Sequence, residues 1–173
     1  MTDEREVLAT TPDGSVRVAR AALGELDDLL LIQRAAFARV ARQFNAPLDS
    51  MPPAHESLGE LVKLEELGVC FLVALEQDGT VVGTVRGELV DETVNVGRLA
   101  VAESQLRRGV ATALMLGLEA AFPKAERFDL FTGAEASGPI RLYERLGYHT
   151  YATERMGSWT MVRMAKKGSG PLP

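Results

Sequence analysis

The sequence contains few of the residues that hold metal ions or form disulfides. Its 173 residues include a single cysteine, Cys70, which excludes an internal disulfide and is typical of a buried thiol in a strand. The two histidines, His55 and His149, do not lie at a metal-ligand spacing from each other or from Cys70. We therefore predict no metal site.

Several motifs of common enzyme classes are also missing. The chain has no Gly-x-Ser-x-Gly nucleophile elbow, no Walker lysine and no Gly-x-Gly-x-x-Gly run. It carries 19 lysines and arginines against 24 acidic residues, for a net charge of −5. A general nucleic-acid binder needs a basic surface to contact phosphates, so we predict no nucleic-acid partner.

Long apolar runs are absent as well. None reaches the roughly 18 residues needed to cross a bilayer. The acidic start MTDEREV lacks the basic-then-apolar order of a signal peptide. We predict a cytoplasmic protein with no membrane partner. With 46% hydrophobic and 25% charged residues, it should form a single domain over residues 1–173, with residues 1–13 and 167–173 flexible.

Hydrophobic periodicity predicts an alternation of strands and helices along the chain. Asp78-Gly79, between two apolar runs, is a strong hairpin signal. Seven strands are expected at residues 15–20, 69–77, 80–90, 93–101, 127–132, 149–154 and 158–166. Four helices are expected at residues 23–39, 54–67, 110–121 and 138–146.

The stretch from Val94 to Met115 (VNVGRLAVAESQLRRGVATALM) is the most informative part of the chain. An apolar strand leads through a polar turn into a helix start, where backbone N–H groups lack acceptors and the helix dipole is positive. Small residues at this start let a bulky anion approach, and two arginines precede it. The pattern predicts a diphosphate cradle. An ordinary strand–turn–helix with arginines in solvent would fit the same residues.

GRLAV followed by RRGVATAL resembles the acyl-CoA-binding motif of the GCN5-related N-acetyltransferases, whose pattern is Arg/Gln-x-x-Gly-x-Gly/Ala. Gly109 and Ala111 match its last two positions, whereas the first falls on Leu106, one residue after Gln105. The resemblance implies that acetyl-CoA is bound as co-substrate. The implied contacts are Leu99, Ala100, Val101, Leu106, Arg107, Arg108, Gly109, Val110, Ala111 and Thr112.

The order of the expected elements is also that of the acetyltransferase family and covers essentially the whole chain. It implies an α/β (α+β) fold with a central mixed, mostly antiparallel sheet of about seven strands and four helices. In that family the strand before the cofactor helix and the strand after it, here strands 4 and 5, are parallel and splay apart. The acyl-CoA arm lies in the gap between them.

A second stretch, PIRLYERLGY from Pro139 to Tyr148, resembles the family signature A-I-x-L-Y-E-K-x-G-F. The resemblance places Tyr143 where it would protonate the departing thiolate, which a phenol with a pKa of about 10 can do at neutral pH. Tyr143 could instead be a core aromatic of an amphipathic helix. The family often has a pantetheine-binding asparagine where this chain has Ala136. The adjacent Ser137 could replace it, or could cap the helix.

The expected reaction is direct attack by an amine on the thioester, without an acyl-enzyme. Glu88 and Glu92, together with Asp91, lie near a strand end where a carboxylate could take the amine proton, or could simply be solvated. In the family, the first two helices, the loop between them and the last hairpin form the wall of the acceptor site. The resemblance therefore implies that residues 44–53 and the turn at residues 156–159 line the acceptor site of this chain.

The expected acceptor is a small molecule, a peptide N-terminus or a protein lysine, and the protein is expected to be a monomer or homodimer. Two other functions remain open at this point. One is a catalytically silent acyl-CoA sensor on the same fold. The other is a nucleotide-phosphate-binding protein, although the chain lacks the lysine motifs of phosphate sites.

Overall fold

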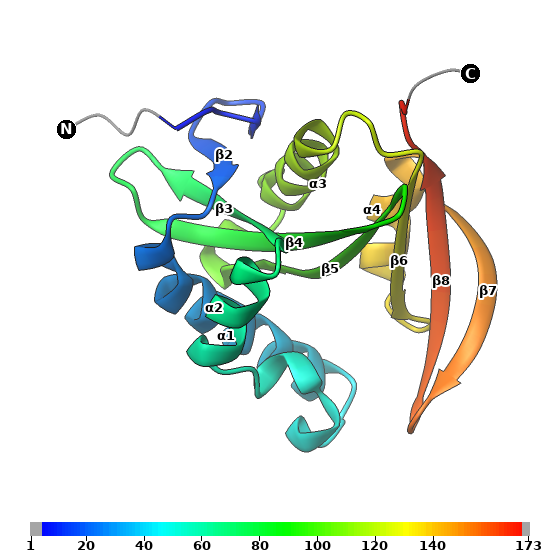
Figure 1. Cartoon of the computed structure of the whole chain (residues 1–173). Helices are drawn as coiled ribbons and strands as arrows, with labels where there is room; N and C mark the ends of the chain where they lie inside the picture. The colour runs from blue at the N-terminus through cyan, green and yellow to red at the C-terminus, as the bar shows by residue number, and fades with distance from the viewer. Residues whose placement is uncertain (1–4, 171–173) are drawn as a thin grey trace.

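The computed structural model describes residues 5–170, which form one eight-stranded sheet with helices on both faces (Figure 1). The strands lie in the order β1-β2-β3-β4-β5-β6-β8-β7. Their bounds are β1 Ala9–Thr10, β2 Val16–Arg20, β3 Cys70–Glu76, β4 Val81–Val90, β5 Thr93–Val101, β6 Arg127–Gly133, β7 His149–Met156 and β8 Trp159–Lys167. The helices are α1 Leu26–Gln43, α2 Leu58–Glu66, α3 Val110–Ala121 and α4 Ser137–Arg145. The predicted mixed, mostly antiparallel architecture with four helices is confirmed.

The sheet contains one strand more than the seven predicted. The additional strand, β1, pairs with β2 through Ala9↔Val18 and Thr10↔Arg17. Two residues are too few for an alternation of apolar and polar side chains to reveal a strand. β1 lies in the N-terminal segment expected to be flexible. Residues 1–4 and 171–173 lie outside the described residues, so the flexibility of the two ends stays a prediction.

The parallel strands are β5 and β6, so the prediction that strands 4 and 5 are parallel is wrong as numbered. β4 and β5 are antiparallel, and β1 shifts the count by one. β5 and β6 pair only at Thr93↔Arg127, Val94↔Phe128 and Asn95↔Asp129. Beyond these three pairs the strands diverge, and Figure 1 shows β6 turning away from β5. Within the described residues, one edge of β5 is therefore left without a strand partner over its C-terminal half.

The helices lie on both faces of the sheet (Figure 1), and an apolar layer on each face fixes them there. One core, which includes Leu114, Leu118 and Phe128, lies between the sheet and the pair α3 and α4. The other, which includes Leu29 and Leu61, lies between the sheet and the pair α1 and α2. The splayed end of β5 and β6 is thus flanked by α3 on one face and by α1 on the other.

α2 begins four residues later than predicted. Ser57 is its N-cap, and its Oγ accepts a hydrogen bond from the backbone N–H of Glu60 at 3.3 Å. The Glu60 carboxylate accepts in return from the Ser57 backbone N–H at 2.7 Å. This capping box fixes the helix start, and residues 52–54 form a separate 3-10 turn. Glu56 is consequently in the connection before α2, not inside the helix.

Two of the helical glycines, Gly117 and Gly59, should respond oppositely to alanine. A Cβ on Gly117 in α3 would lie 2.8 Å from Val18 Cγ1, because the helix approaches β2 closely there. Gly117→Ala is expected to lower the free energy of unfolding by about 1–3 kcal/mol. A Cβ on Gly59 in α2 would meet nothing within 4 Å. Gly59→Ala should therefore raise the free energy of unfolding by about 0.5–1 kcal/mol, through helix propensity alone.

Denaturant unfolding of the two variants measures both effects. Equal stability of Gly117→Ala and the unsubstituted protein would show that α3 can move away from β2 at no cost.

Candidate functional site

The N-terminus of α3 presents free backbone N–H groups at the end of β5. Gly109 is the N-cap with φ of +83° and no side chain to cap the helix. Among residues 5–170, the N–H groups of Val110, Ala111 and Thr112 donate no hydrogen bond to a group outside the helix. Three uncapped N–H groups at the positive end of a helix dipole form a site suited to an anion. This geometry fits the diphosphate of an acyl-CoA.

The turn before α3 exposes its charged side chains and buries one amide. Arg107 and Arg108 are exposed beside the helix start, and Leu106 is 42% exposed. Gln105 is buried, and its Nε2 donates to Glu76 Oε1 at 2.6 Å. The Gln105 side chain therefore contacts β3. It does not take over the role of the Arg or Gln at the first position of the family pattern, where this chain has Leu106.

The edge of β5 that faces β6 offers backbone groups to a ligand. Ala102 N donates to Val82 O, on the β4 side, at 2.8 Å. Alternation along the strand then directs the N–H groups of Leu99 and Val101 to the opposite edge, where β6 has diverged. Arg39 of α1 reaches the same edge and donates from Nη2 to Val101 O at 3.2 Å. An extended amide-containing chain could pair with this edge as an added strand does.

A β-bulge interrupts β5 just before these residues. The register with β4 shifts between Thr84↔Ala100 and Arg86↔Gly97. The bulge contains one extra residue of β5. Arg98 lies within it and has a left-handed backbone with φ of +58°. Such a conformation costs a non-glycine residue about 1–2 kcal/mol. The side chain of Ala100 is buried, so only the backbone of this residue could contact a ligand.

Tyr143 lies on α4 and is 7% exposed. It belongs to the core between the sheet and α3, and its ring meets that of Tyr148 edge to face at 6.0 Å. No group among residues 5–170 forms a hydrogen bond with its hydroxyl. Burial raises the pKa of Tyr143 to about 12. The phenol therefore stays protonated at neutral pH and remains available as a proton donor.

Ser137 is the first residue of α4 and does not cap it, so the capping interpretation is wrong. The N-cap is Ala136, and no side chain caps this helix. The Ser137 hydroxyl is exposed and accepts from Arg141 Nη2 at 3.4 Å. It lies at the loop after β6, on the side where β5 and β6 have diverged.

The candidate carboxylates lie at different levels of the β4–β5 hairpin. Glu88 is exposed on β4 and stands opposite Asn95, the last residue of β5 that pairs with β6. Glu92 is at the hairpin turn, where its carbonyl accepts from the N–H groups of Glu126 and Arg127. Glu92 precedes Val101 by nine residues of extended chain, roughly 30 Å. The geometry therefore favours Glu88 over Glu92 as a base near the open gap.

The structure also assembles an ion cluster around Glu56 that the sequence analysis did not identify. Glu56 Oε1 accepts from Arg86 Nη2 at 3.0 Å and from Arg98 Nη2 at 2.9 Å. Its Oε2 accepts from Gln33 Nε2 at 2.6 Å. Burial alone would raise the pKa of Glu56, but these hydrogen bonds and the two arginine charges hold it below its usual value. The partners lie 23, 30 and 42 residues away, so no local pattern indicates the cluster.

A second cluster lies on β6, at the level where the strands separate. Asp129 is buried and accepts from the Tyr151 hydroxyl at 2.8 Å. It also accepts from Arg127 Nη2 at 2.7 Å. Asp129 pairs with Asn95 across the strands, so this carboxylate and Glu88 lie at the same level of the sheet.

The two segments expected to line the acceptor site contact each other. Phe44 follows α1, and its ring meets that of Trp159 edge to face, with centroids 6.2 Å apart. Trp159 Nε1 donates to Ser50 Oγ at 3.3 Å. The loop after α1 is therefore joined to the β7–β8 hairpin, which bounds the α1 side of the gap.

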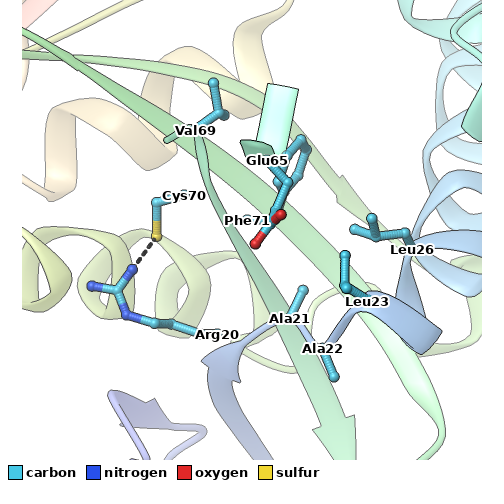
Figure 2. Close-up of a pocket in the computed structure, with 9 residues that line it drawn as sticks. All are labelled: Arg20, Ala21, Ala22, Leu23, Leu26, Glu65, Val69, Cys70 and Phe71. Atoms are coloured by element: carbon cyan, nitrogen blue, oxygen red, sulfur yellow. Dashed lines mark hydrogen bonds between the residues drawn. The ribbon is translucent and has the colours of Figure 1, made fainter. Parts of the chain in front are cut away.

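A small pocket of about 90 Å³ lies elsewhere, between the end of β2 and the start of β3. Figure 2 shows Cys70 and Arg20 on one side of it, and Arg20 Nη1 donates to Cys70 Sγ at 2.9 Å. Cys70 is buried, as predicted. Burial raises the pKa of its thiol even though Arg20 acts in the opposite direction.

Two kinds of feature are absent from the described part of the chain. Within residues 5–170 there is no group of three or more His, Cys, Asp or Glu side chains placed to hold a metal ion. Within the same range, no helix combines the length and apolar character needed to cross a membrane.

Comparisons with known proteins agree with this geometry. The model of the acetyltransferase (GNAT) family matches residues 36–148. The structure is similar to PaiA N-acetyltransferase from Thermoplasma acidophilum in complex with coenzyme A, at 18% identity and a TM-score of 0.75, covering 88% of this chain and 99% of that one. It is also similar to the ribosomal-protein-S18-alanine N-acetyltransferase of Escherichia coli, at 17% identity and a TM-score of 0.73, covering 90% and 96%.

A third similar structure is a phosphinothricin acetyltransferase from Sinorhizobium meliloti in complex with AcCoA, at 16% identity and a TM-score of 0.71, covering 90% of each chain. No curated protein gives a significant match.

Proposed function

Because the chain belongs to the acetyltransferase (GNAT) family and is an N-acetyltransferase of that family, we propose that it transfers the acetyl group of acetyl-CoA directly to a primary amine. The observation that carries this proposal is the uncapped start of α3 at the end of β5. Free N–H groups there lie next to a strand edge that, within residues 5–170, pairs with no other strand. A ligand with a diphosphate for the helix start and an amide-containing arm for the β5 edge would use both features at once.

The helix start binds the diphosphate through backbone N–H groups and the helix dipole. Gly109, Val110, Ala111 and Thr112 form this start, and the small side chains leave room for the anion. Arg107 and Arg108 add electrostatic attraction from solvent. Leu106 contributes apolar contact, and Ser137 is placed to hydrogen-bond the arm from the α4 side.

The β5 edge orients the thioester. Leu99, Ala100 and Val101 supply the backbone along which the arm lies. An N–H of Leu99 or Val101 polarises the thioester carbonyl and stabilises the oxyanion that forms on it. These groups are fixed by the sheet before the substrates bind, so they need no reorganisation during the reaction.

The reaction forms one bond and breaks another. The amine nitrogen attacks the carbonyl carbon, and the C–S bond then breaks as the sulfur leaves. Tyr143 gives its proton to the sulfur, and the proton that the attacking nitrogen loses as the amide forms returns to the phenolate through solvent. A primary amine with a pKa near 10 arrives protonated, so a base must remove a proton first. Glu88 takes this proton, directly or through water, and Glu92 is the less well placed alternative.

The acceptor is a small molecule or a peptide or protein amine. The named acceptors of two similar proteins differ in class, one being a ribosomal protein and the other phosphinothricin. In this chain the acceptor would approach from the α1 side of the gap, past the contact between Phe44 and Trp159. We further propose that residues 1–173 act as a single cytoplasmic domain, as a monomer or homodimer, without nucleic-acid or membrane partners.

Two measurements test the proposal. Isothermal titration should detect acetyl-CoA binding at submillimolar concentrations, and free thiol should be released when acetyl-CoA is mixed with a panel of amines. Absence of binding would remove the proposed cofactor site. Binding without thiol release from small amines, peptides or lysine-bearing proteins would instead identify a silent acyl-CoA sensor.

A further inference from the structure

Glu56 joins three elements that border the gap between β5 and β6. Its carboxylate accepts from Gln33 of α1, Arg86 of β4 and Arg98 of β5. The Glu56 side chain is 14% exposed, and those of Arg86 and Arg98 are 19% and 21% exposed. Arg34 of α1 also donates from Nη2 to the Glu56 carbonyl at 2.7 Å. Glu56 is therefore fixed from both sides and is partly shielded from solvent.

Arg98 needs such a partner because of its backbone. Its φ of +58° belongs to the left-handed region, which favours glycine at this position of a bulge. Nothing in the arginine side chain itself favours that conformation. The Glu56 carboxylate accepts from both Nε and Nη2 of Arg98, at 3.2 and 2.9 Å. Two hydrogen bonds to one charged oxygen hold the side chain, and with it the bulge.

The bulge determines which backbone groups face the gap. Because N–H groups alternate between the two edges of a strand, one extra residue reverses the direction of every group beyond it. With the bulge, the N–H groups of Leu99 and Val101 face the open edge. Without it, the N–H of Ala100 would take their place. The alignment of the thioester along β5 thus depends on one strained residue.

We propose that Glu56 is a positioning residue that holds the β5 bulge through Arg98 and so presents the Leu99 and Val101 amides to acetyl-CoA, a role that rests on the proposed acetyl transfer. The carboxylate of Glu56 pairs with both arginines, and its side chain spans the distance from the loop before α2 to the sheet. That loop belongs to the acceptor side of the gap. The same ion cluster therefore couples the acceptor side to the edge that aligns the co-substrate.

A double-mutant cycle with Glu56→Gln and Arg98→Gly tests this role. Glu56→Gln keeps the size of the side chain but removes its charge. It should raise the Kd for acetyl-CoA and lower kcat by about tenfold each, since the amides are displaced. The Kd for acetyl-CoA and the kcat of Arg98→Gly should stay within about threefold of those of the unsubstituted protein, because glycine adopts positive φ without a partner. In the Arg98→Gly protein, the further change Glu56→Gln should then alter the Kd for acetyl-CoA and kcat by less than about threefold each.

Glu119→Gln is the matched control. Glu119 forms an ion pair of similar burial with Lys166, at 2.7 Å, on α3 and β8. Its loss should lower thermal stability without changing the Kd for acetyl-CoA. The proposal would be overturned if Glu56→Gln still raised the Kd for acetyl-CoA and lowered kcat by about tenfold each in the Arg98→Gly protein. An effect of Glu56→Gln on thermal stability alone would overturn it as well.

Hydrogen exchange separates this inference from the proposed function. Backbone amides in residues 97–101 should exchange faster in Glu56→Gln than in Glu119→Gln, with or without acetyl-CoA. If the unsubstituted protein binds no acetyl-CoA, the proposed function fails, and exchange alone decides the structural role of Glu56. Equal exchange in the two variants would show that Glu56 does not hold the bulge.

Discussion

Gly109→Ala is expected to weaken acetyl-CoA binding by at least about tenfold, measured as Kd by calorimetry. Gly109 has φ of +83°, which costs an alanine about 1–2 kcal/mol. A Cβ there would also lie 3.2 Å from Pro12 Cδ, in the turn between β1 and β2. The turn can relieve both effects only by rotating its peptide groups. That rotation turns the N–H groups at the start of α3 away from the diphosphate.

Gly68→Ala separates this effect from a general loss of stability. Gly68 has φ of +91°, between α2 and β3, and a Cβ there would meet nothing within 4 Å. The backbone strain is therefore similar, but the position is remote from the start of α3. Both variants should unfold at lower temperature, and only Gly109→Ala should lose affinity for acetyl-CoA. Unchanged affinity in Gly109→Ala would mean that the helix start does not bind the diphosphate.

Tyr143→Phe is expected to lower kcat by about a hundredfold while the Kd for acetyl-CoA stays nearly unchanged. Removing a proton donor raises the barrier for loss of the thiolate, whereas the ring still fills its place in the core. Burial raises the pKa of Tyr143 to about 12. Ionisation of this phenol should therefore not reduce turnover of the unsubstituted protein until about pH 11. Initial rates of thiol release across this pH range measure both effects.

Tyr148→Phe is the matched control for Tyr143. The two rings are in contact and both are buried, but the Tyr148 hydroxyl donates to Glu119 Oε1 at 3.2 Å. Loss of that hydrogen bond should cost about 1 kcal/mol of stability without affecting kcat. If Tyr143→Phe and Tyr148→Phe both retained full turnover, the Tyr143 hydroxyl would have only a packing role.

Local sequence patterns predicted most of the fold because each depends on neighbouring residues. Asp78-Gly79 forms the turn between β3 and β4, with Gly79 at φ of +88°. The strand before Gly109 and the helix after it appear where hydrophobic periodicity placed them. Gly109 occupies the N-cap position of α3, one residue before the predicted helix start at residue 110. In each of these cases, the conformation follows from the chemistry of a few consecutive residues.

Contacts between distant segments escaped the sequence analysis. Glu56 was assigned to a helix, and its three partners come from separate elements. Asp129 and Tyr151 lie 22 residues apart, and nothing local links them. β1 was missed because its two residues gain their strand conformation only by pairing with β2. The Ser-x-x-Glu capping box at Ser57 was the one local signal that could have corrected the start of α2.

The sequence by itself determined most of the elements, their order and the start of α3, since periodicity, turn residues and helix capping act over a few residues. The tertiary structure decided how far β5 and β6 remain paired, where the bulge lies in β5 and which carboxylates reach the gap. Those features depend on packing between segments 20 or more residues apart, which bring Gln33 and Arg86 to Glu56. Only folding places these side chains within hydrogen-bonding distance.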